Sequence, residues 1–374
     1  NTELASFIQT EEKVTAILNC QDKQETAEFD YLCGCDGARS TTREQLGIKF
    51  PGGTYQQKFF VADVESPDEV IHGLQIGVTD LDFCLAFPVR SSKTVRLIGI
   101  VPPEYERKEE IQFTDVQEAI VRNMQIKVTD VNWFSTYHVH HRVVPRFRVG
   151  RVFLAGDAAH IHSPVGGQGM NTGIGDSINL SWKLAAVLQG TLSEKILDTY
   201  ESERLPFAQK LVGTTDKIFQ IATSRSFLGT TWRKFIFPYL FPMIFKRQAL
   251  KQYFFKFVSQ MKINYRSSAL SIKNNGTIQG GDRLPWIKTG ETDNFKPLTQ
   301  LTWQVHVYGK ANEQLRTTLQ KQNIPLTEFA WSTATKDKGF AENAAYLIRP
   351  DGYISVIDAS EDGEQIEKML LSFR

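Results

Sequence analysis

Residues 151–190 constrain the fold more than any other part of the chain, because they predict a buried strand, a glycine-rich loop and a long helix in direct succession. The apolar run at 152–155 is typical of a strand covered on both faces. The sequence SPVGGQGMN at 163–171 then places three glycines directly before a helix start, whose first N–H groups lack intrahelical partners. Apolar residues follow at helical spacing, at Ile174, Ile178, Trp182 and Ala185. Such a helix start favours negative charge on a ligand, and Asp157 can accept hydrogen bonds from sugar-like hydroxyl groups.

On spacing alone, this segment could equally be an ordinary strand, loop and helix in which the glycines only make turns. The stretch GDAAHIHSPVGGQGMNTGIGDSINLSWKLA, however, closely resembles the second flavin-contacting motif of the single-component aromatic hydroxylases. That family includes phenol hydroxylase, p-hydroxybenzoate hydroxylase and 3-(3-hydroxyphenyl)propionate hydroxylase. The resemblance implies that Gly156 and Asp157 bind the ribityl part of FAD and that Pro164 lies near the flavin carbon that carries the hydroperoxide. It also implies that a run of backbone faces the isoalloxazine ring, with these expected contacts: Gly166, Gly167, Gly169, Met170 and Asn171.

A second motif, CDGARSTTR, lies earlier in the chain. Asp36 and Gly37 predict a turn, and Ser40 is the expected N-cap of a short helix. The motif resembles the hydroxylases' shared flavin and nicotinamide motif, which implies that Asp36 and Gly37 contact the ribityl chain and that Arg39 and Arg43 lie near the nucleotide phosphates. The alternative is an Asx turn at Asp36 and a surface ion pair at Arg39. Two motifs in the family's order favour the cofactor interpretation.

The dinucleotide-binding fingerprint is missing, because the chain begins at Asn1 without a strand followed by GxGxxG. A βαβ unit that carries this fingerprint needs roughly 30 residues, and the family normally places it before the segment that begins here. Either the sequence is a fragment or the protein has lost its ADP cradle. We expect a fragment, because a doubly wound sheet without its central strand would fold poorly.

Residues 51–144 are rich in strand patterns separated by turn residues. The resemblance implies a twisted sheet above the reacting face of the flavin, with apolar side chains that form the substrate pocket. The alternation at 83–87 divides side chains between two faces, with Phe83, Leu85 and Phe87 on one and Cys84 and Ala86 on the other. Either face could line the pocket, and both could be core. Residues 112–126 show a helical pattern.

The C-terminal third predicts a further domain. Residues 216–275 are expected to form a helical cover of the sheet, although the Phe, Lys and Arg of 217–262 leave a membrane-surface or partner-binding face as an alternative. Glycine, asparagine and aspartate concentrate near 276–285, which indicates a linker. Residues 285–374 predict the β, α, β, β, β, α order of a thioredoxin-like core, and YLIRPDGYIS resembles a hairpin of the cysteine-free domain in phenol hydroxylase relatives. Without a thiolate this domain cannot exchange thiols, so a structural role or a homodimer contact is expected.

Composition excludes several classes of function. A formal net charge of +1 and a pI of about 7.8 give no reason to expect nucleic-acid binding. The four cysteines follow no disulfide or metal spacing, and Cys33 and Cys35 are expected to pack in the core. His138 and His140 share a strand face without an evident third ligand, so no metal site is expected. With no signal peptide or membrane span in the pattern, a cytoplasmic location is expected.

The sequence therefore predicts an α/β and α+β protein with a p-hydroxybenzoate hydroxylase-like, Rossmann-like FAD domain at 1–50 and 145–215. A substrate sheet follows at 51–144, a helical cover at 216–275 and a thioredoxin-like domain at 285–374. The resemblance implies a monooxygenase that uses FAD, NADPH or NADH, and O2 to hydroxylate a small phenolic substrate through a flavin C4a-hydroperoxide. The alternatives are a related flavoenzyme that acts on a polyketide or antibiotic, and a truncated, flavin-free binding or assembly protein.

Overall fold

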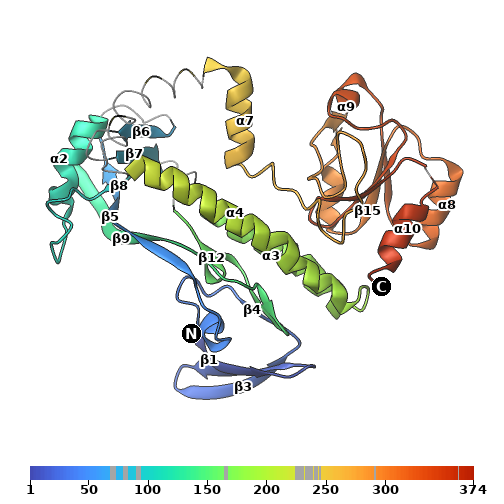
Figure 1. Ribbon diagram of the computed structural model, residues 1–374, viewed down its shortest axis with the longest axis horizontal. Helices are drawn as coiled ribbons and strands as arrows, with labels where there is room; N and C mark the ends of the chain where they lie inside the picture. The colour runs from blue at the N-terminus through green and yellow to red at the C-terminus, as the bar shows by residue number, and fades with distance from the viewer. Residues whose placement is uncertain are drawn as a thin grey trace.

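The computed structural model describes the 374-residue chain except for 68–72, 79–82, 90–93, 164–166, 290–291, 361 and most of 224–245. The fold is mixed α/β. Figure 1 shows three parts along the longest axis: a large sheet with one covering helix, a central pair of long helices, and a C-terminal sheet with its own helices.

The large sheet has the strand order β12-β9-β5-β8-β7-β6. Its strands are β5 (Gly52–Glu65), β6 (Gln75–Val78), β7 (Phe83–Pro88), β8 (Thr94–Ile100), β9 (Asp130–Val143) and β12 (His160–Ile161). Helix α2 (Phe113–Met124), predicted at 112–126, packs on one face, where Cys84 and Ala86 are buried. Leu85 and Phe87 are half-buried on the opposite face, and the side chain of Phe83 lies outside the described residues. The face under α2 is therefore core, and the opposite face is the one that can border a pocket.

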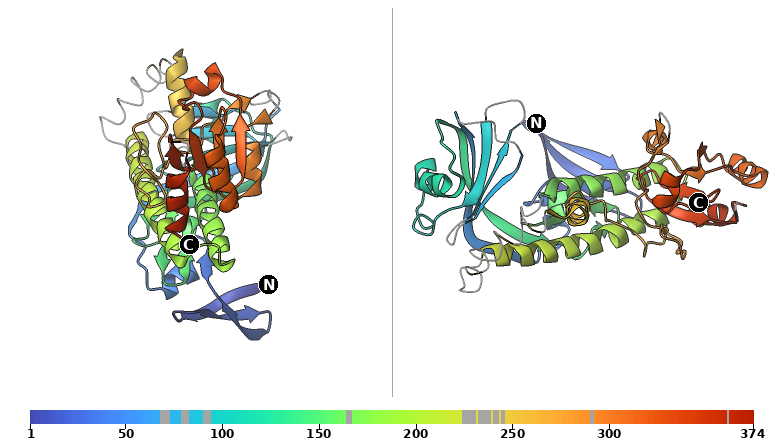
Figure 2. Two further views of the ribbon diagram at one scale, coloured as in Figure 1. Left: turned by 90° about the vertical axis from the view of Figure 1, so that its right-hand side faces the viewer. Right: turned by 90° about the horizontal axis from the view of Figure 1, so that it is seen from above.

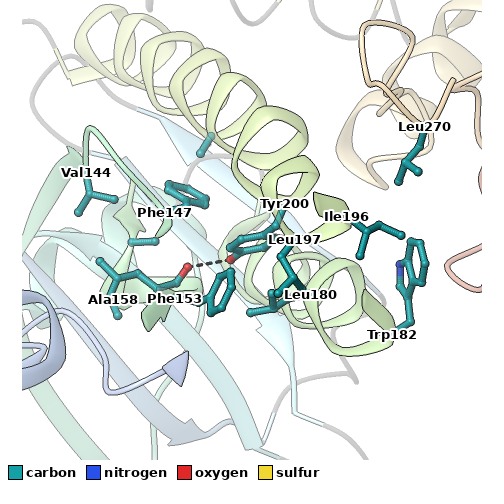
Figure 3. Packing of buried hydrophobic residues seen from close by; sticks show 13 residues of the cluster. Val144, Phe147, Phe153, Ala158, Leu180, Trp182, Ile196, Leu197, Tyr200 and Leu270 are labelled. Atoms are coloured by element: carbon teal, nitrogen blue, oxygen red, sulfur yellow. Dashed lines mark hydrogen bonds between the residues drawn. The ribbon is translucent and has the colours of Figure 1, made fainter. Parts of the chain in front are cut away.

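The centre of the molecule joins a short sheet to two antiparallel helices. Its elements are β4 (Leu32–Gly34), β10 (Arg148–Val149), β11 (Val152–Leu154), η1 (Gly156–Ala158), α3 (Gly169–Leu188), η2 (Glu194–Leu197) and α4 (Asp198–Thr223). Phe147, Phe153 and Tyr200 are fully buried between them (Figure 3), and the Tyr200 hydroxyl donates a hydrogen bond to the carbonyl of Leu154 at 2.7 Å. This bond fixes α4 to the end of β11, the strand that leads into the turn at Gly156 and Asp157.

The N-terminal strands form a three-stranded antiparallel sheet. They are β1 (Thr2–Gln9), β2 (Val14–Cys20) and β3 (Lys23–Phe29), and this sheet projects from one end of the molecule in Figure 2. The predicted short helix, α1 (Thr41–Gln45), is confirmed, with the Ser40 side chain as its N-cap. The expectation for Cys33 and Cys35 was wrong, because both are exposed, with their sulfur atoms 3.6 Å apart.

Helix α3 is confirmed, but its apolar stripe does not face the core. Ile174 and Ile178 are each 49% exposed, and only Trp182 of the predicted stripe is buried. The buried face of α3 is instead largely polar, and its members recur at helical spacing: Thr172, Asp176, Asn179 and Lys183. Burial of these polar groups requires partners for each of them, and the partners come from distant parts of the chain.

The C-terminal sheet has the strand order β16-β15-β17-β18, with β15 parallel to β16 and antiparallel to β17. The elements of this part are β13 (Lys288–Thr289), β14 (Thr292–Asp293), η4 (Lys296–Gln300), β15 (Gln304–Tyr308), α8 (Glu313–Lys321), β16 (Leu326–Phe329), α9 (Thr333–Asp337), β17 (Ala345–Ile348), β18 (Ile354–Asp358) and α10 (Glu364–Leu371). The sequence prediction lacked α9. The glycine-rich stretch near 276–285 packs against this sheet, where Ile278 and Leu284 are buried.

A buried ionic cluster joins the C-terminal sheet to the central helices. The Arg349 guanidinium, from the turn after β17, donates to both carboxylate oxygens of Glu203 at 2.6 and 2.9 Å. Lys183 donates to the same carboxylate at 2.8 Å, and Asp351 accepts from Arg349. Arg349, Glu203 and Lys183 have no exposed side-chain surface.

One further helix, α7 (Gln248–Val258), lies above α4 in Figure 1 and has no buried residue. Among the residues that the structure describes, no helix is long and apolar enough to cross a bilayer.

Candidate cofactor site

The two predicted cofactor motifs meet at one edge of the central sheet. Strand β4 pairs in parallel with β11, with Gly34 opposite Leu154. Because the carboxyl ends of parallel strands lie at the same edge of a sheet, the turn at Asp36 and the turn at Asp157 come together. This is the edge at which open α/β sheets bind their ligands.

The first turn presents a carboxylate that also caps a helix. One oxygen of Asp36 accepts hydrogen bonds from the backbone N–H and the hydroxyl of Thr42, each at 2.9 Å. Burial alone would raise the pKa of Asp36, but the hydrogen bonds from Ser40 and Thr42 outweigh it and lower the pKa. Gly37 has φ +81°, a backbone conformation that favours glycine. Asp36 is therefore ionised and oriented at neutral pH.

Arg43 links the two turns. Its guanidinium donates to the carbonyls of Ala158 and Ala38 at 3.1 and 2.9 Å and lies over the ring of Phe50. Arg43 is only 5% exposed, and its guanidinium links the backbone at Ala38 to the backbone at Ala158. Arg39 is the exposed arginine of this motif.

The second turn needs glycine for a close approach between backbones. Gly156 has φ +59°, and a Cβ atom on Gly173 of α3 would lie 3.2 Å from the Gly156 Cα. The side chain of Asp157 follows directly and is exposed. The turn thus presents a carboxylate beside the first turns of α3.

A buried aspartate that the sequence analysis missed anchors this turn. Asp176 accepts hydrogen bonds from the Gly156 N–H at 3.0 Å, the His160 Nε2–H at 2.7 Å and the Arg204 Nε–H at 2.7 Å. Burial alone would raise the pKa of Asp176, but the bond from His160 and the charge of Arg204 lower it below its usual value. The regular polar positions on α3 were the available signal, since Asp176 is one of them. His160 and Arg204 therefore have structural partners.

The start of α3 is held from outside the helix. The Arg204 guanidinium donates to the Thr172 carbonyl at 3.0 Å, and the Gln260 amide donates to the Thr172 hydroxyl at 2.7 Å. Met170 is 76% exposed and Asn171 is also exposed. The first turn of α3 therefore presents exposed side chains at a fixed position.

The glycine-rich loop before α3 is described only in part. Gly167 has φ +61° and Gly169 begins α3, whereas Pro164 and Gly166 lie outside the described residues. Ser163, directly before them, is fully buried and donates to the Thr215 carbonyl of α4 at 3.5 Å. The beginning of the loop is thus held next to α4.

A polar cluster lies next to this point, where α4 meets β5 and β9. The Tyr55 hydroxyl donates to the Asp216 carboxylate, and His141 Nδ1 lies 3.7 Å from the same carboxylate. Burial, and then the hydrogen bond to Asp216, raises the pKa of Tyr55. In the described part of the chain no three His, Cys, Asp or Glu side chains are grouped as metal ligands would be.

These features suit FAD. A ribityl chain offers hydroxyl groups to the carboxylates of Asp36 and Asp157, and a helix start favours the negative charge of a reduced flavin ring. The glycine conformations at Gly37, Gly156 and Gly167 allow the backbone to approach a flat ligand closely.

Comparisons with known proteins also support FAD binding. A family model described as an FAD binding domain matches residues 1–215. A flavin-dependent monooxygenase of Mycobacteroides abscessus is 31% identical over 375 residues, which cover 96% of this chain and 70% of that protein. A 3-(3-hydroxy-phenyl)propionate/3-hydroxycinnamic acid hydroxylase of Burkholderia cenocepacia is 35% identical over 229 residues, which cover 57% of this chain and 40% of the hydroxylase.

Among solved structures, the OxyS anhydrotetracycline hydroxylase from Streptomyces rimosus matches the whole chain with a TM-score of 0.78 and 26% identity, and the match covers 74% of OxyS. The arrangement of the sheet, the central helices and the C-terminal part is thus shared with that enzyme.

Proposed function

Because this chain belongs to the FAD-binding monooxygenase family of oxidoreductases, we propose that it is an FAD-dependent, NAD(P)H-consuming monooxygenase that hydroxylates a phenolic or similar aromatic substrate. The observation that carries the proposal is the convergence of the Asp36 and Asp157 turns at one sheet edge, beside the start of α3. When bound, FAD would supply the redox chemistry and the activation of O2.

Each part of the site has a role in this proposal. Asp36 and Asp157 accept hydrogen bonds from the ribityl hydroxyls, while Gly37 and Gly156 let the backbone come close. Arg39 is assigned to the nucleotide phosphates. The flavin ring would lie against the loop before α3 and the first turn of α3, at Gly166, Gly167, Gly169, Met170 and Asn171. Pro164 is assigned to the reacting edge of the ring from the motif resemblance alone.

The domain assignment belongs to the same proposal. We assign FAD binding to 1–50 and 145–215, the substrate sheet to 51–144, a helical cover to 216–275 and a thioredoxin-like domain to 285–374. The mixed order β16-β15-β17-β18 with flanking helices supports the last assignment. No cysteine occurs there, so we assign it a structural role that is compatible with a homodimer.

A polyketide or other fused-ring phenol is the second candidate substrate, because OxyS matches the entire chain. Turnover assays with 3-(3-hydroxyphenyl)propionate, phenol and a tetracyclic phenol, in the presence of NADH or NADPH, separate the two substrate classes. Oxidation of the nicotinamide without hydroxylated product in every assay would contradict both.

The first test is an absorbance spectrum of the purified chain after incubation with FAD and removal of the excess. A stoichiometric visible flavin band is expected. A folded chain without the band would contradict the proposal and support a flavin-free binding protein.

Asp157→Ala is expected to raise the dissociation constant for FAD about tenfold to a hundredfold, which corresponds to losing a hydrogen bond of about 1.5–3 kcal/mol to a charged group. Because Asp157 is exposed, the unfolding midpoint should stay unchanged. Quenching of flavin fluorescence measures the binding. Asp22→Ala, at an exposed turn between β2 and β3, is the control. If Asp157→Ala and Asp22→Ala bound FAD with equal affinity, Asp157 would not be part of the FAD site.

Ile98→Trp is expected to raise KM for the aromatic substrate at least about tenfold and to leave FAD binding unchanged. Ile98 pairs with Leu85 on the half-buried sheet face opposite α2, where we place the substrate pocket. An indole there would fill space that the substrate needs. Steady-state kinetics of this variant and of Val131→Trp, at an exposed position of β9, provide the check. An unchanged KM for Ile98→Trp would contradict the placement of the substrate pocket on this face of the sheet.

A further inference from the structure

Two of the four cysteines lie together at the end of β4, directly before the Asp36 turn. Because successive side chains of a strand alternate between its faces, Cys33 and Cys35 point to the same face. Both side chains are exposed, and their sulfur atoms are 3.6 Å apart. Cys84, by contrast, is buried, and Cys20 is half-buried. Reagents in solution therefore reach the sulfur atoms of the pair most readily.

The backbone between the two thiols is held by its neighbours. The carbonyl of Gly34 accepts a hydrogen bond from the Ala155 N–H at 3.0 Å, and Gly34 lies opposite Leu154 of β11. On the face opposite the thiols, a Cβ atom on Gly34 would lie only 2.7 Å from the Cβ of Thr42. The strand therefore keeps the two thiols side by side.

The spacing of the pair permits a disulfide, but a strained one. A disulfide needs sulfur atoms about 2.05 Å apart and Cα atoms about 4.4–6.8 Å apart. Two steps along a strand, at about 3.3 Å per residue, place the two Cα atoms about 6.6 Å apart, near the upper limit. Rotation of the side chains can close the remaining distance between the sulfur atoms. Because strain makes a disulfide easier to reduce, a bridge at this place would be reversible.

One thiol of the pair ionises more easily than the other. The hydrogen bond from Cys33 lowers the pKa of Cys35 to about 7, although partial desolvation acts in the opposite direction. The same hydrogen bond, and then desolvation, raises the pKa of Cys33. At neutral pH, Cys35 is therefore partly thiolate, the form that reacts with peroxides, and Cys33 remains a thiol beside it.

We propose that Cys33 and Cys35 form an oxidation site, at which a peroxide converts the two thiols into a reversible disulfide that weakens FAD binding at the adjacent Asp36 turn. The Cys35 thiolate attacks one oxygen of hydrogen peroxide, the O–O bond breaks, and hydroxide departs, so that Cys35 becomes a sulfenic acid. The Cys33 sulfur then attacks the Cys35 sulfur, the S–O bond breaks, and water departs. In sum, the two thiols lose two electrons and two protons, and the peroxide becomes two molecules of water.

Oxidation should affect the cofactor site because Cys35 directly precedes Asp36. A bridge draws Cys35 toward Cys33 and displaces the Asp36 carboxylate, whose orientation depends on hydrogen bonds from Thr42. The effect on FAD rests on the proposed function, whereas the disulfide does not. We expect the oxidised chain to bind FAD about tenfold more weakly, as for the loss of one hydrogen bond to a charged group. By reciprocity, saturating FAD should make the disulfide about tenfold easier to reduce in glutathione buffers.

The test is mass spectrometry of the full chain after treatment with hydrogen peroxide, blocking of the remaining thiols with N-ethylmaleimide in denaturant, and digestion with trypsin. The tryptic peptide 24–39 contains Cys33 and Cys35 and no other cysteine. We expect it to carry no maleimide and to have two hydrogen atoms fewer than the reduced peptide, and we expect dithiothreitol to restore both thiols. Quenching of flavin fluorescence then compares the FAD affinity of the reduced and the oxidised chain.

The matched control is Cys20→Ser, which should form the disulfide and lose FAD affinity on oxidation like the unchanged chain. Cys33→Ser cannot form the bridge, so the sulfenic acid on Cys35 should instead be trapped by dimedone. Circular dichroism checks that both variants are folded.

Two maleimide labels after peroxide treatment would overturn the oxidation site, as would sulfinic or sulfonic acids in place of the disulfide, or a bridge between two chains. Equal FAD affinity of the reduced and the oxidised chain would overturn the link to the Asp36 turn. A reduced chain that does not bind FAD would contradict the proposed function and, with it, this link, whereas the masses of peptide 24–39 would still decide whether the disulfide forms.

Discussion

Replacing Arg349 with methionine is expected to lower the free energy of unfolding by about 3–5 kcal/mol, because it breaks a buried ion pair by removing one partner. Arg349 supplies two hydrogen bonds to Glu203 and two to Asp351, and all three side chains are inaccessible to solvent or nearly so. In the variant, Glu203 would keep the ammonium of Lys183, whereas Asp351 would lose the guanidinium that it is paired with. Glu203 lies on α4 and Arg349, 146 residues later, follows β17. The variant should therefore weaken the contact between the C-terminal sheet and α4.

Urea unfolding followed by circular dichroism measures this effect. The control is Arg316→Met, which removes an ion pair of similar length, 2.7 Å to Glu328, whose side chains are 38% and 34% exposed. Its expected cost is below about 1 kcal/mol. The unfolding free energy of Arg349→Lys should lie between those of Arg349→Met and Arg316→Met, because an ammonium keeps the charge but cannot make the paired hydrogen bonds. If Arg349→Met were as stable as Arg316→Met, the cluster would not stabilise the contact between the two parts.

The elements of the cofactor site could be predicted from sequence because their signals are local. A short apolar run, a Gly-Asp turn and three closely spaced glycines predict the strand, the turn and the loop without knowledge of the rest of the fold. Ser40 at the start of α1 is a signal of the same kind, and the structure confirms it as a cap.

The partners within the fold could not be predicted, because they lie far apart in sequence. The helical spacing of Ile174 and Ile178 correctly indicated α3, but periodicity alone does not say which face is buried. That face is decided by Arg204 and Glu203 of α4, whose charges require polar partners on α3. A polar stripe at helical spacing within an otherwise apolar helix is the sequence signal that corresponds to such a cluster.

Asp176→Asn is the second variant with a large expected effect. It keeps the size of the side chain and removes the charge that faces Arg204, whose side chain is 1% exposed. An uncompensated guanidinium inside the protein is expected to cost about 3–5 kcal/mol of unfolding free energy. Because Asp176 also accepts from the Gly156 N–H and from His160, the turn before Asp157 should loosen, and FAD should be retained less well. Asp198→Asn, whose carboxylate is 76% exposed, serves as the control.

The pH dependence of the stability difference between the unchanged chain and Asp176→Asn distinguishes loss of the charge from disturbed packing. The pKa of Asp176 is lowered in the folded protein, so its contribution to stability is complete above the ordinary carboxyl pKa of about 4 and is lost as the pH falls through the lower folded value. The stability gap between the unchanged chain and Asp176→Asn should therefore be largest near neutral pH and should narrow in acid. Urea unfolding at a series of pH values measures the gap. A gap that stays constant as the pH falls to about 3 would mean that asparagine disturbs packing, and that the ion pair with Arg204 is not what holds the Gly156 turn to α3 and α4.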